Sequence, residues 1–289
     1  MSPSISVVIP NYNYGIYLEI AIKSCLDQTL LPSEIIVIDN FSQDDSKRIV
    51  EGFRDSRIKF LTCDNGGSIA RSRNFGASIA TSTFLAFLDA DDVWFRRKLE
   101  LQVRAMTEMV GLSYHSVSRF GKRGGVFRAW DLNSNSPLES LLSGGNPIVT
   151  SSVMIRREIF TESGGFPENP ELFAAEDYAL WLNLASNNVK FRRLSNTLAG
   201  YRVHNSASTV VDNTKATELA AIPHLNGAKE NVKAMHAGFL AYSNGVQALA
   251  NGNLNAARKF FADSIAVAHF RFRWRAAVNL LRTLKFRKG

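Results

Sequence analysis

The chain has 289 residues, of which 45% are hydrophobic and 21% are charged, and this composition is typical of a globular protein. Its two cysteines, Cys25 and Cys63, provide neither a disulfide framework nor a zinc-binding spacing, and we expect reduced thiols in a cytosolic protein. No stretch approaches the length that spans a bilayer, and the first apolar run, residues 5–10, is too short for a signal peptide.

Residues 1–110 alternate strand and helix patterns. Strands are predicted at 5–10, 34–39, 57–62 and 84–89, and helical patterns follow them. This alternation predicts an α/β fold with a mostly parallel, doubly wound sheet, which binds ligands at the carboxyl ends of its strands. The G-x-G-x-x-G fingerprint is absent after the first strand, which argues against a nicotinamide or flavin oxidoreductase.

Beyond residue 110 the pattern weakens and then becomes helical. The predicted strands are 112–120, 126–130, 149–155, 189–193 and 197–203, and the predicted helices are 156–163 and 174–186. After about residue 212 a two-helix hairpin, with its turn at Gly252 and Asn253, resembles one tetratricopeptide-like unit. We therefore expect a first domain over 1–212 and a helical region over 213–289 that packs on this domain or on another subunit.

The net charge is +8, and much of the excess lies at the C-terminal end of the chain. Residues 269–289 contain no acid, and arginines and lysines there interleave with Phe270, Phe272 and Trp274. Such a helix suits an anionic membrane surface. A helix docked on the domain with a solvated basic face is the alternative. Nucleic-acid binding is disfavoured because no recognition motif accompanies the charge.

Three carboxylates end the apolar run 84–88. Asp89 and Asp91 are two residues apart, so in an extended chain their side chains point the same way. Two converging carboxylates repel each other unless a cation lies between them, and a hard divalent ion that also takes phosphate oxygens suits the pair. A solvated acidic turn, with Asp92 as its third member, is the alternative.

Seven motifs occur in a fixed order within residues 4–208. They are V-V-I-P-N-Y-N at 7–13, I-V-I-D-N-F-S-Q-D at 36–44, N-G-G-S-I-A-R-S-R-N-F-G at 65–76, F-L-D-A-D-D-V-W at 87–94, G-G-F at 164–166, A-E-D-Y-A-L-W at 175–181 and Y-R-V-H at 201–204. Together they resemble glycosyltransferase family 2, the inverting sugar-nucleotide enzymes of the GT-A fold. The resemblance implies a GT-A (Rossmann-like) sheet flanked by helices, with the helical C-terminal region as an appendage.

The resemblance also implies a nucleotide site at the ends of the first strands. The residues expected there are Pro10, Asn11, Tyr12, Asp39, Asn65, Arg71 and Asp89, with Arg73 less directly involved. Asp39 would hydrogen-bond the base, which is uracil in many members. The family often has D-D-G-S at this point, whereas residues 39–42 read D-N-F-S, so the identity of the nucleotide stays open.

Other positions of the motifs imply the chemistry. Asp91, with His204, would hold Mn²⁺ or Mg²⁺, which stabilises charge on the leaving diphosphate. Asp177 would be the general base that takes the proton of the acceptor hydroxyl, although an acid there can also cap a helix. Further contacts to acceptor or diphosphate are expected from Glu176, Trp181 and Arg202, and Arg202 could instead pair with an acid of the helix at 176.

The predicted function is metal-dependent, inverting transfer of one sugar from a nucleoside diphosphate sugar, with a UDP-sugar expected first. The acceptor is expected to be a glycan or lipid-linked hydroxyl in cell-surface polysaccharide synthesis. The Q-x-x-R-W signature of processive synthases is missing, which favours single transfer. A catalytically inactive GT-A-fold scaffold is the alternative. We expect a cytoplasmic protein without nucleic-acid partners; peripheral attachment to the inner face of the cell membrane and self-association through the helical C-terminal region stay open.

Overall fold

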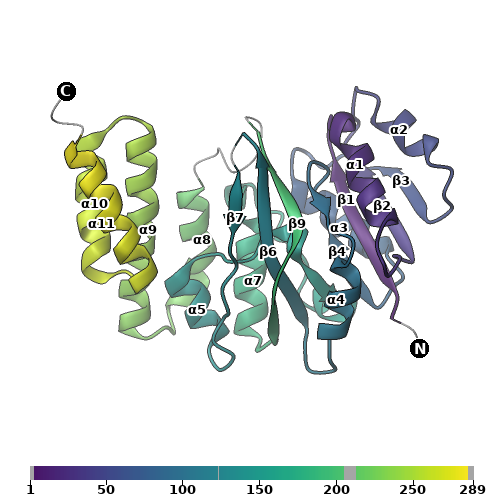
Figure 1. Ribbon diagram of the computed structural model, residues 1–289. Coiled ribbons are helices and arrows are strands. Elements are labelled where there is room, and N and C mark those ends of the chain that lie inside the picture. The colour runs from purple at the N-terminus through teal and green to yellow at the C-terminus, as the bar shows by residue number, and fades with distance from the viewer. Residues whose placement is uncertain (1–2, 123, 205–212, 286–289) are drawn as a thin grey trace.

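The computed structural model describes residues 3–122, 124–204 and 213–285. Its body is a nine-stranded mixed sheet with helices on both faces, and α9, α10 and α11 lie together beyond one end of it (Figure 1). Along the sheet the strands follow the order β3-β2-β1-β4-β8-β6-β9-β5, and β7 pairs with β6.

The N-terminal half of the sheet is parallel, as the alternating pattern predicts. Its strands are β1 (Ile5–Asn11), β2 (Glu34–Asp39), β3 (Ile58–Thr62) and β4 (Phe84–Phe87). They are joined by α1 (Gly15–Leu26), α2 (Ser46–Gly52) and α3 (Ile69–Ile79). Both β2 and β4 pair in parallel with β1, so the loops that carry Asp39 and Asp89 leave the same edge of the sheet.

The C-terminal half is mixed. Its strands are β5 (Val93–Trp94), β6 (Leu112–Gly121), β7 (Gly125–Phe127), β8 (Met154–Arg156) and β9 (Phe191–Val203). Its helices are α4 (Lys98–Ala105), α5 (Pro137–Gly144), α6 (Arg157–Glu162) and α7 (Glu176–Ser186), with 3-10 turns at Thr150–Ser152 and Pro170–Leu172. β8 runs antiparallel to both β4 and β6, whereas β6 and β9 are parallel.

Three details of this half differ from the predictions. The two strands expected at 189–193 and 197–203 are one strand, β9, because a register shift opposite His115 and Ser116 absorbs the polar interruption. The strand expected at 149–155 begins as the 3-10 turn and only then becomes β8. The prediction also missed β5 and α5, which are short and lack a long apolar period.

The strands are apolar at nearly every position because both faces of the sheet are covered. Along β1, Val8 faces a core cluster that contains residues of α3 and α7. Its neighbours Val7 and Ile9 face a second cluster that contains residues of α1 and α4. Burial on both faces is what a central parallel strand requires.

The C-terminal region consists of α8 (Thr214–Leu225), α9 (Glu230–Ala250), α10 (Leu254–Val267) and α11 (Phe270–Lys285). The predicted hairpin is present as α9 and α10. A Cβ at Gly245 would lie 2.6 Å from the Phe261 ring, so the two helices need glycine there. Gly252 turns the chain at φ 75°, and the side chain of Asn253 caps α10. Among the helices described here, none combines the length and apolarity needed to cross a bilayer.

Candidate active site

The acids after β4 lie in a tight turn. The amide of Asp92 donates to the carbonyl of Asp89 at 3.0 Å, so the chain turns here. The sequence analysis had assumed an extended chain. The two carboxylates consequently have different partners: Asp89 Oδ1 accepts from Arg73 at 2.6 Å, and Asp91 Oδ2 lies 2.8 Å from His204 Nε2. Their charges still interact, since burial and the nearby Asp89 raise the pKa of Asp91.

Arg73 connects this turn to α7. It is buried, and its guanidinium donates to Asp89 through Nη2 and to Glu176 Oε1 through Nη1 at 2.8 Å. Burial alone would lower the pKa of Arg73, but the two carboxylates outweigh burial and raise it. The expected nucleotide contact Arg71 lies instead on the exposed side of α3, 3.2 Å from Glu168. The fold therefore brings Arg73, rather than Arg71, to the acid cluster.

Asp177 lies in the first turn of α7, next to Glu176. Its carboxylate accepts from the amide of Tyr178 at 2.6 Å and from the side chains of Asn146 and Thr150, each at 3.3 Å. Burial and the charge of Glu176 raise the pKa of Asp177 to about 7. A carboxylate with a pKa near neutrality is suited to act as a general base.

The ends of β1 and β2 are joined by a buried network around Asp39. This carboxylate accepts from Asn11 Nδ2 at 2.7 Å and from both the hydroxyl and the amide of Ser42, at 2.6 and 2.8 Å. Phe41 is exposed and has φ 53°, the left-handed conformation that glycine favours. The loop thus keeps a glycine-type shape although phenylalanine occupies the position. Pro10 is buried within β1, whereas Tyr12 is exposed beyond its end.

The glycine-rich turn before α3 is held by Asn65. Its buried side chain donates to Ser72 Oγ at 2.9 Å and accepts from the amide of Gly67 at 2.8 Å, while its own amide donates to Asn40 Oδ1 at 3.2 Å. Gly66 and Gly67 have φ values of 57° and 81°. In this structure the side chain of Asn65 shapes the turn, and the glycines leave its backbone accessible.

Arg202 of β9 holds the acid turn through hydrogen bonds to Asp91 and Asp92. Arg202 stacks between the rings of Tyr17 and Phe120, 4.4 Å from each centroid, and its Nε donates to the Asp91 carbonyl at 2.9 Å. The suggestion that Arg202 pairs with an acid of the helix at 176 is therefore wrong. Its amide donates to Asp92, whose pKa is raised by burial and by the other two acids of the turn.

The expectation that Trp181 contacts the acceptor is also wrong. Its side chain is fully buried and packs edge-on against Phe166 in the core, so no substrate can reach it. Trp181 lies on the inward face of α7, and the sequence motif does not reveal that orientation.

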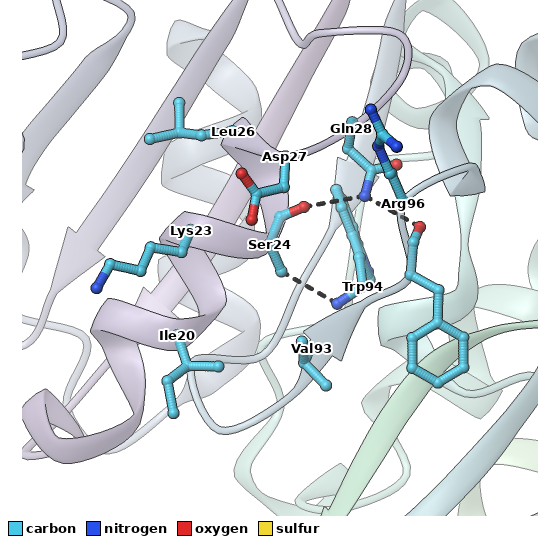
Figure 2. A pocket seen from close by; sticks show the side chains of 10 residues that line it. Ile20, Lys23, Ser24, Leu26, Asp27, Gln28, Val93, Trp94 and Arg96 are labelled. Carbon is cyan, nitrogen blue, oxygen red and sulfur yellow. Dashed lines mark hydrogen bonds between the residues drawn. The ribbon is translucent and has the colours of Figure 1, made fainter.

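One cavity of about 960 Å³ is lined by several of these side chains. Its lining includes Arg73, Asp89, Glu176, Asp177 and His204, together with residues of β6, β9 and α9. A second hollow, about 790 Å³, lies between α1 and β5, and the described residues that line it differ from those of the first cavity (Figure 2). There Gln28 donates to the carbonyls of Ser24 and Phe95, and the Ser24 hydroxyl accepts from the Trp94 amide.

Asp91 and His204 are the residues that fit a divalent metal. Divalent Mg²⁺ is usually held by one or two carboxylates and by the phosphates of a substrate, and imidazole is an accepted ligand of transition metals. No larger group of His, Cys, Asp and Glu side chains in the described part of the chain is arranged to hold a metal. The pair thus suits an ion that arrives with a nucleotide diphosphate.

Comparison with known proteins finds relatives that are named glycosyltransferases. WfaP of Escherichia coli, named a UDP-Glc:alpha-D-GlcNAc-diphosphoundecaprenol beta-1,3-glucosyltransferase, is 32% identical over 203 residues, which make up 69% of this chain and 77% of WfaP. Longer relatives also match, and the chain spans 35% of an uncharacterised glycosyltransferase of Rickettsia conorii.

Two solved structures share the fold. TarS of S. aureus in complex with UDP-GlcNAc superposes with a TM-score of 0.67 at 19% identity, over 97% of this chain and 89% of TarS. The mannosyltransferase PcManGT of Pyrobaculum calidifontis, in complex with GDP-Man and Mn²⁺, gives 0.65 at 17% identity, over 98% and 81%. These likenesses confirm the expected GT-A fold. The profile described as Glycosyl transferase family 2 matches residues 6–164, and the chain belongs to this family.

Proposed function

We propose that the protein is a metal-dependent, inverting glycosyltransferase that moves one sugar from a nucleoside diphosphate sugar to a hydroxyl group. The observation that carries this proposal is Asp177, a carboxylate whose pKa is about 7, on the wall of a cavity that Asp89 and His204 also line. A UDP-sugar is the first donor to test, because the name of WfaP includes UDP-Glc and TarS was crystallised with UDP-GlcNAc. The acceptor named for WfaP is lipid-linked, which supports the same class here.

The chain's own groups account for the proton and for the geometry. Asp177 takes the acceptor proton while the acceptor oxygen attacks the anomeric carbon and the bond to the diphosphate breaks, which inverts the configuration. Arg73 keeps Asp89 and Glu176 in place and balances their charge. Asp91 and His204 would hold Mn²⁺ or Mg²⁺, and such an ion neutralises charge on a departing diphosphate.

The test measures release of nucleotide from a panel of UDP-, GDP-, TDP- and CDP-sugars, with and without Mn²⁺, together with calorimetric titration of the free nucleotides. We expect one donor to be used in a metal-dependent manner, and Asp177→Asn to lose turnover while it still binds nucleotide. Asp263→Asn, at an exposed position on α10, is the matched control and should be fully active. Nucleotide binding without turnover from any donor would favour the inactive scaffold.

We also propose that α11 attaches the enzyme to an anionic membrane surface. Phe270, Trp274, Leu281 and Leu284 are 68%, 73%, 61% and 51% exposed, and their spacing aligns them along one face of the helix. The opposite face, with Phe272 and Ala276, is buried. Aromatic anchors beside cationic side chains suit the headgroup region of a bilayer.

The charge of the same helix argues for lipid over a second copy of the chain. The described part of α11 carries no acid, and Arg273, Arg275 and Arg282 are exposed. Two such helices face to face would bring like charges together, whereas anionic headgroups neutralise them. We expect co-sedimentation with vesicles of phosphatidylglycerol and phosphatidylcholine but not with phosphatidylcholine alone.

The variant that tests this surface replaces both Trp274 and Leu281 by serine and should no longer sediment with the vesicles. The matched control is Met109→Ser, an exposed apolar side chain elsewhere (75%). If the double variant instead abolishes a concentration-dependent dimer and leaves vesicle binding intact, the face is a subunit interface.

A further inference from the structure

One wall of the cavity that Asp177 lines is formed by α9, which lies outside the residues that the family profile matches. Val246, Gln247 and Ala250 line this cavity, and all three belong to the last turns of α9, whereas the family profile ends at residue 164. Ala250 follows Gln247 by three residues and Val246 by four, so the side chain of Ala250 lies beside both of the others on the helix. The helical C-terminal region therefore contributes directly to the site and is more than a separate appendage.

The helix that forms this wall also packs, through an earlier part of its length, on the segment that contacts the Asp177 carboxylate. His236 of α9 lies with Nδ1 2.9 Å from the carbonyl of Leu142, near the end of α5. Gly145 follows that helix at φ 70°, and a Cβ there would lie 2.8 Å from the ring of Phe239 on α9. The next residue, Asn146, donates its amide to Asp177. The position of α9 thus fixes the segment that orients the base.

The chemistry of the wall is neutral and mixed. The Gln247 side chain is partly buried, and its amide has no hydrogen-bond partner among the residues that the structure describes. An amide offers both donors and an acceptor, which suits sugar hydroxyl groups. Val246 and Ala250 beside it present apolar surface to the C–H face of a sugar ring. The cationic side chains that line the cavity, Arg73, Arg119 and Lys122, lie outside α9.

We infer that Gln247 is a specificity-determining residue that contacts a hydroxyl group of the acceptor sugar. The ring lies between α9 and Asp177, with one hydroxyl group on Asp177 as the nucleophile and another on the Gln247 amide. This inference rests on the proposed transferase function, because it assigns the acceptor side of the same cavity. It assigns the substrate class as a pyranose with at least two free hydroxyl groups.

The test uses phenyl glycosides of glucose, N-acetylglucosamine, galactose and mannose as acceptors with the most active donor. We expect at least one of these glycosides to accelerate nucleotide release. In Gln247→Ala the KM for that glycoside should rise about three- to tenfold, the loss expected for one hydrogen bond. The donor KM and the acceptor-free hydrolysis rate should stay within about twofold of wild type.

Asn231→Ala, in the exposed first turn of α9, is the matched control and should leave all of these values unchanged. An unchanged acceptor KM in Gln247→Ala would overturn the inference. If no donor is turned over at all, the transferase proposal fails separately. The wall is then examined by saturation-transfer NMR of the same glycosides with UDP present, where neutral glycosides should bind wild type and bind Gln247→Ala more weakly; no binding to wild type would overturn the inference.

Discussion

Asp177→Asn should make the protein more stable at neutral pH while it removes activity. The pKa of this carboxyl rises from an ordinary 3.8 to about 7 in the folded protein. Between these two pH values the folded state holds a proton that the unfolded chain has released, so the contribution of Asp177 to the free energy of unfolding falls as pH rises. At 1.36 kcal/mol per pKa unit, the full loss is about 4 kcal/mol above pH ~7.

Urea unfolding of wild type and of Asp177→Asn, followed by circular dichroism from pH 4 to pH 8, measures this contribution. Asparagine keeps the shape and can still accept from the Tyr178 amide, so the comparison isolates the charge. We expect the variant to gain stability over wild type progressively through this range, and to reach a plateau above pH ~7. In the same range the kcat of the wild type should rise with pH, because only the deprotonated carboxylate can accept the proton.

A stability difference that does not change between pH 4 and pH 8 would refute the raised pKa. A variant that is less stable than wild type at pH 8 would show that the hydrogen bonds from Asn146 and Thr150 outweigh the cost of burying the charge. Asp263→Asn provides the pH-independent baseline, since Asp263 is exposed on α10.

Three further predictions concern buried charges and the metal pair. Arg73→Met leaves Glu176 and Asp89 without their partner and should lower the free energy of unfolding by about 3–5 kcal/mol, measured in urea, whereas a loss below ~1 kcal/mol would contradict the bridge. Lys98→Met should stabilise the protein at pH 7, because burial puts the pKa of Lys98 well below its usual range; the gain should shrink as pH approaches ~10.4, and a pH-independent gain would refute this cause. His204→Ala should abolish the Mn²⁺ dependence of nucleotide binding in calorimetry and leave metal-free binding unchanged; retained dependence would remove His204 from the metal site.

The parallel half of the fold was predictable because its signals are local. β2 covers the predicted residues 34–39, and β1 differs from the predicted 5–10 by one residue at its end. The C-terminal half depends on pairings between distant segments, which periodicity does not encode. The single long β9 exists because β6 lies beside it, and the shift in register at His115 is a property of that pair.

The site residues illustrate the same limit at the level of side chains. Arg71 and Arg73 are two positions apart on α3, so they point to nearly opposite sides of the helix, and the sequence does not say which side faces the acids. In the motif at 175–181, Glu176 and Asp177 line the cavity, but the tryptophan faces the core. A signal for Gln247 is absent from the motifs, because α9 reaches the cavity only through tertiary packing.

The contact between Gly145 and Phe239 has a consequence for how the family motifs function in this chain. A polypeptide cut after residue 212 would retain every motif of the transferase family, yet it would lose the helix against which the Asn146 segment rests. We expect the alignment of base and acceptor to depend on the stiffness of this joint, so that loosening α9 weakens catalysis before it weakens nucleotide binding. An activity assay of residues 1–212 alone would then report an inactive enzyme, although the cause would be the loss of the support that α9 provides.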